Sequence, residues 1–280
     1  MAQRILTWMK NNYLLLLAGF CLVFTGVILL NIYYWFSTSD NTENLLQTIQ
    51  YQEVVEVEDV GSSTPEDGIV TADDSTPEGV KRPPYIEVDF TSLKERNPDI
   101  VAWLKFDAVG VSIPIVQTTD NEFYLTHDVD KKPSKLGWVF ADVRSNMEIM
   151  GFNTVFYGHN NSNRQMFGAL KEIFNVKESE KTIKEIIQLT TPYSKMVFQV
   201  VSVYVTNYED WKYVDQVFTD EQEKQEFIDM IKERNTMPLF DSDISPLDRI
   251  LTFSTCYGPA GTEDRLVIHA KMVAEEWVTP

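Results

Sequence analysis

The chain has 280 residues, a formal net charge of −18 at pH 7 and 44% hydrophobic residues. This is enough apolar sequence for one sizeable core with appendages. Residues 11–80 contain eleven acidic residues and no Lys or Arg, so much of the acidity lies outside that core. No basic patch stands out, which argues against a nucleic-acid-binding protein.

An apolar stretch near the N-terminus predicts a membrane anchor. Residues 13–36 carry no charge, and 24 residues rising about 1.5 Å each cross a hydrocarbon layer of roughly 30 Å with some tilt. Basic residues precede this stretch and acidic residues follow it. The positive-inside rule therefore places residues 1–12 in the cytoplasm and the rest of the chain outside the cell. The charges in question are Arg4, Lys10, Asp40 and Glu43.

The alternative to an anchor is a cleaved signal peptide. The apolar stretch is longer than the 7–15 residues of a typical signal, and no small-x-small cleavage site follows it. The aromatic cluster at residues 33–36 suits a membrane interface and not a signal peptidase. An uncleaved anchor is therefore the better interpretation.

Residues 37–84 are predicted to form an acidic extracellular stalk. Residues 61–68 and 75–79 are almost repeats, rich in Gly, Ser, Pro and acidic side chains. Such sequence cannot bury enough apolar area to offset its ordering entropy, and its charges keep it extended. A short helix is expected only over residues 41–57. The stalk should add nothing to the core of the domain.

The remaining residues, 85–280, are predicted to form a mainly β domain. Short runs of alternating or β-branched residues, separated by turns, indicate eight strands, and so many strands with few helices favour a closed barrel. A short helix is expected over 89–97, a second over 165–174, and a third over 220–234 that begins with a capping box at Thr219 and Gln222. The predicted strands are 100–106, 111–117, 136–141, 153–157, 185–189, 195–207, 249–254 and 265–273.

One cysteine is a candidate nucleophile. Cys256 ends a predicted strand, and the other cysteine, Cys21, lies in the apolar stretch, so no disulfide within the domain is available. A thiol must become a thiolate to attack an amide, and a nearby histidine can promote this and protonate the departing amine. The resulting oxyanion needs a donor, which Arg265 can supply from the start of the next strand. A lone cysteine is nevertheless more often simply buried.

The three histidines differ in context. His159 follows a strand end and Gly158, a position typical of catalytic side chains. His269 in mid-strand looks structural, and His127 looks like a surface or capping residue. No cluster of His, Cys and carboxylate residues has metal-ligand spacing, and no phosphate-binding glycine loop is present. Neither a metal nor another cofactor is expected.

These segments resemble the sortases, and class B sortases in particular. Thr252-Phe253-Ser254-Thr255-Cys256 resembles the family's cysteine motif, Tyr157-Gly158-His159-Asn160 its histidine motif, and the strand opening at Arg265 its arginine motif. Further matches, in order, run from about residue 89 to residue 273, and include Asp142-Val143-Arg144. Two departures, Phe253 for the usual leucine and Val143 for a common aromatic, keep apolar character.

The resemblance implies a sortase-type barrel with a helix inserted before the last strands, and a membrane-anchored cysteine transpeptidase. Such an enzyme cleaves a C-terminal LPXTG- or NPQTN-like sorting signal through a thioester on Cys256, with His159 as general acid and base and Arg265 holding the oxyanion. It then transfers the surface protein to the amine of a peptidoglycan precursor (lipid II) or to a pilin lysine. Substrate-groove residues carried over by position are Asn121, Leu125, Tyr157, Ser254 and Thr255.

Other functions remain open at this point. A cysteine hydrolase would use the same three residues with water as the acceptor, and a catalytically silent surface-anchored binding domain would not need all three. Within sortases, a housekeeping anchor, a haem-uptake anchor and a pilus polymerase are not separated by the sequence.

Overall fold

The computed structural model describes residues 12–56, 85–181, 185–240, 243–259 and 261–278. The chain divides into two compact units, residues 1–45 and residues 46–280. The predicted anchor lies in helix α2 (Tyr13–Glu53), which is long and apolar enough to be a candidate membrane span. Its polar Thr25 and Asn31 side chains donate to backbone carbonyls four residues earlier, which removes their need for water.

Residues 37–84 contain more regular structure than their composition predicts. Helix α2 continues to Glu53, so the predicted helix over 41–57 is the end of a longer one, and β1 (Val54–Glu56) pairs antiparallel with β2 (Ile86–Val88). Ile49 is fully buried. The expectation that this segment adds nothing to the domain is therefore wrong up to residue 56, because apolar residues at helical spacing continue past the anchor. Residues 57–84 lie outside the described part of the chain.

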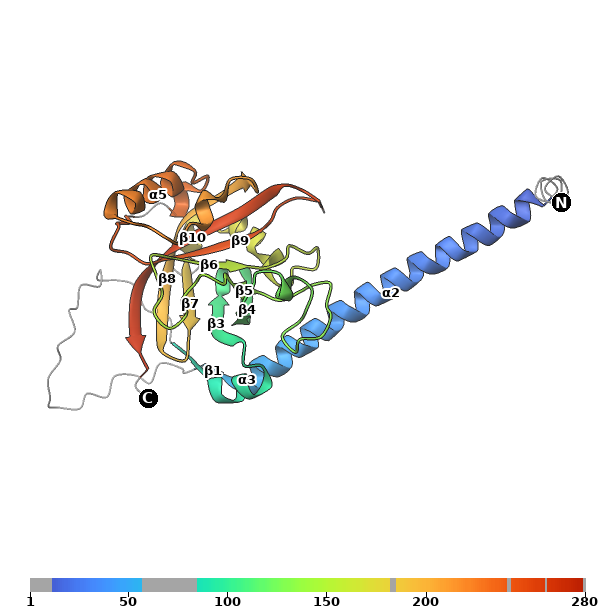
Figure 1. Cartoon of the computed structure of the whole chain (residues 1–280), viewed down its shortest axis with the longest axis horizontal. Helices are drawn as coiled ribbons and strands as arrows, with labels where there is room; N and C mark the ends of the chain where they lie inside the picture. The colour runs from blue at the N-terminus through green and yellow to red at the C-terminus, as the bar shows by residue number, and fades with distance from the viewer. Residues whose placement is uncertain (1–11, 57–84, 182–184, 241–242, 260, 279–280) are drawn as a thin grey trace. The chain divides into compact units, whose positions relative to one another are not determined.

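Eight strands close into a barrel in the order β10-β8-β7-β3-β4-β5-β6-β9, as the sequence predicts (Figure 1). The β4–β5 and β6–β9 pairs are parallel, and the other pairs in the barrel are antiparallel. The strands are β3 (Ile100–Phe106), β4 (Val111–Val116), β5 (Phe140–Ala141), β6 (Asn153–Tyr157), β7 (Ile186–Thr190), β8 (Ser194–Asn207), β9 (Ile250–Cys256) and β10 (Asp264–Trp277).

The barrel interior is packed with aromatic rings around Phe253. This side chain is fully buried, and its ring centroid lies 6.1, 6.0 and 5.7 Å from those of Phe106, Phe156 and Phe167. Edge-on and tilted aromatic pairs at this spacing stabilise a core beyond the area that they bury. The phenylalanine in the cysteine motif is therefore a core residue of β9.

The helices follow the prediction with two corrections. Helix α3 (Phe90–Arg96) lies within the predicted range and is capped by Asp89. Helix α5 (Glu221–Glu233) is capped by Asp220 and not by Thr219, since the Asp220 carboxylate accepts the amide of Glu223. Carboxylates suit this position because the helix N-terminus is positive.

The predicted helix over 165–174 is instead a 3₁₀ segment, η3 (Phe167–Asn175). Its buried side chains Phe167, Leu170 and Ile173 are three residues apart, the period of a 3₁₀ helix. The range of the prediction is therefore nearly right, and the type of helix is wrong. The remaining short 3₁₀ turns are η1 (Asp107–Val109), η2 (Phe123–Leu125), η4 (Glu178–Glu180), η5 (Trp211–Val214) and η6 (Pro238–Phe240).

Candidate functional site

The outer face of four neighbouring strands carries the candidate site. Because side chains alternate along a strand and Phe253 of β9 points into the core, its neighbours Ser254 and Thr252 point outward, as does Cys256. The register of β6, β9, β10 and β8 extends this outward row sideways. The segment with η5 and α5 packs on this part of the barrel, and Figure 1 shows α5 outside β8 and β10.

Cys256 and Arg265 are register partners at one end of this face. Each lies directly opposite the other across the antiparallel β9–β10 pair, and both are partly exposed. Opposed residues of this kind bring their side chains within reach of one another. The Arg265 guanidinium donates to the Asp264 carbonyl at 3.0 Å and lies 5.7 Å from the centre of the Tyr208 ring. The thiol and the guanidinium thus lie together at one end of the β9–β10 pair.

His159 is delivered to the same end by a parallel strand. Tyr157 of β6 is in register with Ser254 of β9, and His159 and Cys256 each follow two residues later. The loop that carries His159 is held to β9 because the Thr255 hydroxyl donates to the Gly158 carbonyl at 2.7 Å. Gly158 has no room for a side chain, since a Cβ there would lie 2.9 Å from the Phe167 ring.

The His159 ring is oriented by a backbone carbonyl. Its Nε2 atom lies 2.8 Å from the Leu125 oxygen. A carbonyl can only accept, so Nε2 must carry the hydrogen. The neutral ring then presents Nδ1 as its basic atom, which is the nitrogen available to exchange a proton with a reactant.

The five predicted groove residues take different positions. Leu125 is exposed and Tyr157 is half-buried, whereas Ser254 and Thr255 are 4% exposed each. The hydroxyls of those two are already hydrogen-bonded, that of Ser254 to the Tyr213 hydroxyl at 3.2 Å. The Asn121 carboxamide accepts the Val143 amide at 2.8 Å. Ser254 and Thr255 therefore fix neighbouring segments: Ser254 bonds to Tyr213 in η5, and Thr255 bonds to Gly158 in the loop that carries His159.

A buried carboxylate of the matched Asp142-Val143-Arg144 motif, to which the sequence analysis assigned no role, lies beside Tyr157. Asp142 is fully buried; it accepts the Tyr157 hydroxyl at 2.9 Å and two nitrogens of the Arg144 side chain at 2.9 and 2.8 Å. Burial alone would raise the pKa of Asp142, but the hydrogen bonds from Arg144 and Tyr157 lower it below its ordinary value. Burial and the Asp142 charge raise the pKa of Tyr157, so this pair stays ionised carboxylate and neutral phenol.

The other two histidines make contacts within the fold. His127 stacks on the Phe123 ring at 4.1 Å between centroids and bonds to the Phe123 carbonyl. His269 is fully buried. Within the described ranges, no group of three His, Cys, Asp or Glu side chains could hold a metal ion.

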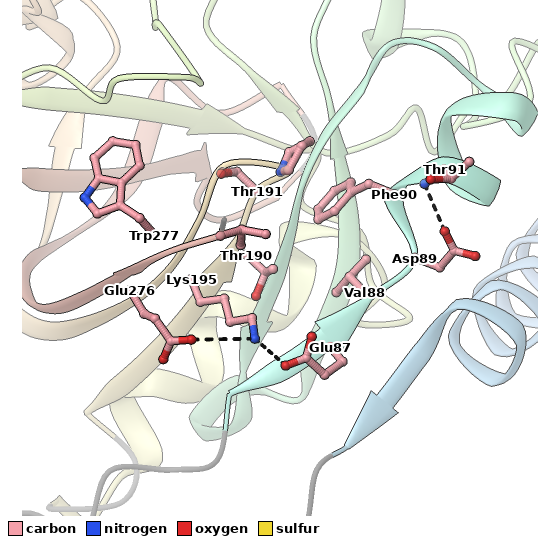
Figure 2. Close-up of a pocket in the computed structure, with 12 residues that line it drawn as sticks. Glu87, Val88, Asp89, Phe90, Thr91, Thr190, Thr191, Lys195, Glu276 and Trp277 are labelled. Carbon is pink, nitrogen blue, oxygen red and sulfur yellow. Dashed lines mark hydrogen bonds and ion pairs between the residues drawn. The ribbon is translucent and has the colours of Figure 1, made fainter. Parts of the chain in front are cut away.

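A groove of about 450 Å³ lies at the other end of β10. There Lys195 faces Glu276 in register, eleven residues along β10 from Arg265. Figure 2 shows the Lys195 ammonium between the carboxylates of Glu87 and Glu276. This groove contains none of the predicted site residues, and its one ammonium is paired with two carboxylates.

Known proteins are similar to this chain in sequence and in structure. Residues 104–273 match the family model of the sortase domain. Sortase B from Staphylococcus aureus is 31% identical over 194 residues, 69% of this chain and 78% of the relative. A solved S. aureus sortase B–substrate complex superposes with a TM-score of 0.59 at 32% identity, covering 66% of this chain and 84% of that one. Sortase B from Bacillus anthracis gives 0.65 at 25% identity, with 85% and 99% covered.

Proposed function

Because this chain belongs to the sortase family, and its relatives are sortase B proteins, we propose that it is a class B cysteine transpeptidase whose catalytic residues are Cys256, His159 and Arg265. The observation that carries the proposal is the register of β6, β9 and β10. It delivers a thiol, an imidazole and a guanidinium to one end of the barrel from three adjacent strands.

The reaction divides into two acyl transfers. The Cys256 thiolate attacks the carbonyl carbon of the scissile amide, and the guanidinium of Arg265 stabilises the oxyanion that forms. The C–N bond then breaks as His159 gives a proton to the leaving amine, and a thioester remains on Cys256. A second amine attacks the thioester, His159 takes its proton, and the thiolate is released with a new amide bond.

The proposed substrate is the C-terminal sorting signal of a surface protein, of the LPXTG or NPQTN type. The proposed acceptor is the amine of a peptidoglycan precursor, and the alternative acceptor is a pilin lysine. The helix α2, a candidate membrane span, supports a single-pass protein, and the flanking charges favour a cytoplasmic N-terminus and an extracellular catalytic domain. This topology would place the thiol on the side of the membrane where wall precursors are found.

The acceptor decides between a transpeptidase and a hydrolase. Purified enzyme is incubated with a sorting-signal peptide, with and without a small amine such as triglycine, and the products are identified by mass. The proposal predicts that the amine diverts the acyl group into a new amide-linked product and accelerates turnover. If the free acid is the product at every amine concentration, the enzyme is a hydrolase.

A further inference from the structure

A chain of buried hydrogen bonds crosses the outer face of the barrel, under the segment that covers it. The Tyr204 hydroxyl on β8 lies 2.9 Å from Nε2 of His269 on β10, whose Nδ1 lies 2.8 Å from the hydroxyl of Thr252 on β9. Thr252 in turn donates to the side-chain oxygen of Asn153 on β6 at 2.6 Å. All of these side chains are 2% exposed or less.

The direction of this chain is fixed by its members. Because the Thr252 proton is used on Asn153, Thr252 must accept from Nδ1–H of His269, and Nε2 then accepts from Tyr204. The Asn153 oxygen is thereby held, and its amino group points outward. It donates to the carbonyls of Tyr213 and Asp215, at 3.3 and 2.8 Å.

A second element holds the same backbone from another side. Arg144 donates to the Val214 carbonyl at 3.3 Å, and the Ser145 hydroxyl donates to the Gln216 side chain at 2.7 Å. The turn that carries both is itself fixed, since the Gln117 amide donates to the carbonyls of Asp142 and Ser145, each at 2.8 Å. Each of the four consecutive residues 213–216 thus accepts a hydrogen bond from Asn153, Arg144 or Ser145.

The first of these four residues is Tyr213. It is 2% exposed, packs with Val267 and Tyr157, and hydrogen-bonds to Ser254, the outward residue next to Cys256 on β9. Burial raises the pKa of Tyr213, with smaller influences from the nearby Arg265 and Cys256. Tyr213 therefore lies against Tyr157 and against Ser254, two residues before Cys256 on β9.

We propose that Asn153 and Arg144 are positioning residues: by holding the carbonyls of η5 and Asp215 they keep Tyr213 seated on Ser254, and so set the wall of the substrate groove beside Cys256. The inference rests on the proposed transpeptidase function for its kinetic consequence. Neither side chain touches the thiol, so their loss should misplace bound peptide and leave the chemistry of Cys256 itself intact. Small displacements of this kind lower the catalytic efficiency of enzymes by up to about 10²-fold.

The test compares Asn153→Leu with Thr154→Val in the folded protein. Leucine fills the space of asparagine without its donors. Thr154 is the adjacent residue on β6, and its buried hydroxyl has no hydrogen-bond partner among the described residues, so valine should change nothing. Three quantities are measured: KM and kcat for the peptide, the rate at which iodoacetamide alkylates Cys256, and hydrogen exchange over residues 211–216.

For Asn153→Leu, we expect KM to rise about 10- to 100-fold, with kcat and the alkylation rate staying within about threefold and with faster exchange confined to residues 211–216. Thr154→Val should match the wild type in all three. If alkylation falls in parallel with cleavage, or if exchange over 211–216 rises while KM stays constant, the positioning role is wrong.

Arg144→Lys covers the case in which Asn153→Leu does not fold. Lysine keeps the charge beside Asp142, but it cannot reach Asp142 and the Val214 carbonyl together as the guanidinium fork does. The same pattern, with a smaller rise in KM, is expected, and an unchanged KM overturns the proposal. Failure of the wild-type enzyme to cleave any sorting peptide would instead refute the proposed function. The hydrogen-exchange data would still test whether Asn153 and Arg144 hold residues 211–216 in place.

Discussion

At the scale of single residues, the site depends on where strands end. Cys256 is the last residue of β9, and Arg265 is the second residue of β10. Both face outward and are partly exposed, whereas Ser254, two residues earlier on β9, is buried and hydrogen-bonds to Tyr213 of the segment that covers this face. Position along the strand therefore decides that Ser254 is buried support while Cys256 is accessible to a reactant.

The role of Arg265 can be tested with Arg265→Lys. Lysine retains a positive charge but has no planar fork of donors. If the guanidinium stabilises the oxyanion, kcat should fall by about 10²–10³, the usual cost of losing such a donor. Steady-state cleavage of a sorting peptide measures this, and full activity of the lysine variant would limit Arg265 to a structural role.

The role of His159 can be tested with His159→Ala on two substrates. With a peptide amide, the variant loses the donor for the leaving amine, and kcat/KM should fall by roughly 10²–10⁴. With an activated thioester, whose leaving group needs no proton, much of the acylation rate should return. An equally large defect on both substrates would exclude His159 as the general acid.

At the scale of elements, the outer face of β6, β9, β10 and β8 is a second core, in which a polar network lies among apolar side chains. The inner side of these strands packs apolar rings around Phe253, whereas the outer side holds the connected side chains of Tyr204, His269 and Thr252 beneath η5 and α5. Because every side chain in this network has a hydrogen-bond partner, the network favours one arrangement of the segment with η5 and α5 that covers it.

Burial of His269 predicts a pH dependence of stability. Desolvation lowers the pKa of His269 to about 3 in the folded protein, against about 6.5 when unfolded. Between these values the unfolded chain binds a proton that the folded one does not, so the stability is fully present above pH 6.5 and is lost as the pH falls. The loss is about 1.4 kcal/mol per pH unit, or about 2 kcal/mol at pH 5.

This dependence is measured by denaturant unfolding at pH 7 and pH 5 for the wild type and His269→Gln. Glutamine retains polar atoms but does not titrate, and other acidic groups contribute equally to both proteins. The wild type should lose about 2 kcal/mol more than the variant. Equal losses would show that His269 is not buried in its neutral form.

The barrel strands could be predicted from the sequence because alternation is a local signal. β3 and β6 begin and end at the predicted residues, whereas β5 is four residues shorter at its start and β10 extends four residues further, to Trp277, since strand ends depend on pairing partners. Cys256, His159 and Arg265 were identified through motifs. Asn153, Arg144 and Tyr213 were not assigned roles, because their contacts join segments about 60–70 residues apart and leave no periodic trace.

At the scale of the whole molecule, the chain combines a candidate membrane span with a barrel domain. The N-terminal boundary of that domain lies earlier in the chain than composition predicts. The acidic segment predicted as a stalk begins as helix, and it supplies Ile49 and β1 to the second compact unit. Composition over long windows does not detect such contributions, because a single buried side chain and three paired residues change the average very little.

The contribution of Ile49 and β1 predicts a difference between two truncated chains, one beginning at Leu46 and one at Lys81. Both should fold and cleave peptides, because β2, the partner of β1, lines the groove at the other end of β10 from Arg265. The shorter chain should have a free energy of unfolding lower by about 1.5–3 kcal/mol, the usual contribution of one buried Ile side chain. Urea unfolding at neutral pH measures it. Equal stabilities would show that residues 46–56 are not part of the folded domain, and failure of the shorter chain to fold would place the boundary elsewhere.

The central claim is that an acyl group passes through Cys256, and intact-protein mass measured during turnover tests it most directly. With a sorting-signal peptide in excess, the account predicts a covalent adduct whose mass equals the N-terminal acyl fragment, mapped to Cys256 and discharged when an amine is added. Cys256→Ala, folded as judged by its unfolding transition, should form no adduct and release no product. Cleavage by Cys256→Ala at anything near the wild-type rate, or an adduct on another residue, would contradict the account.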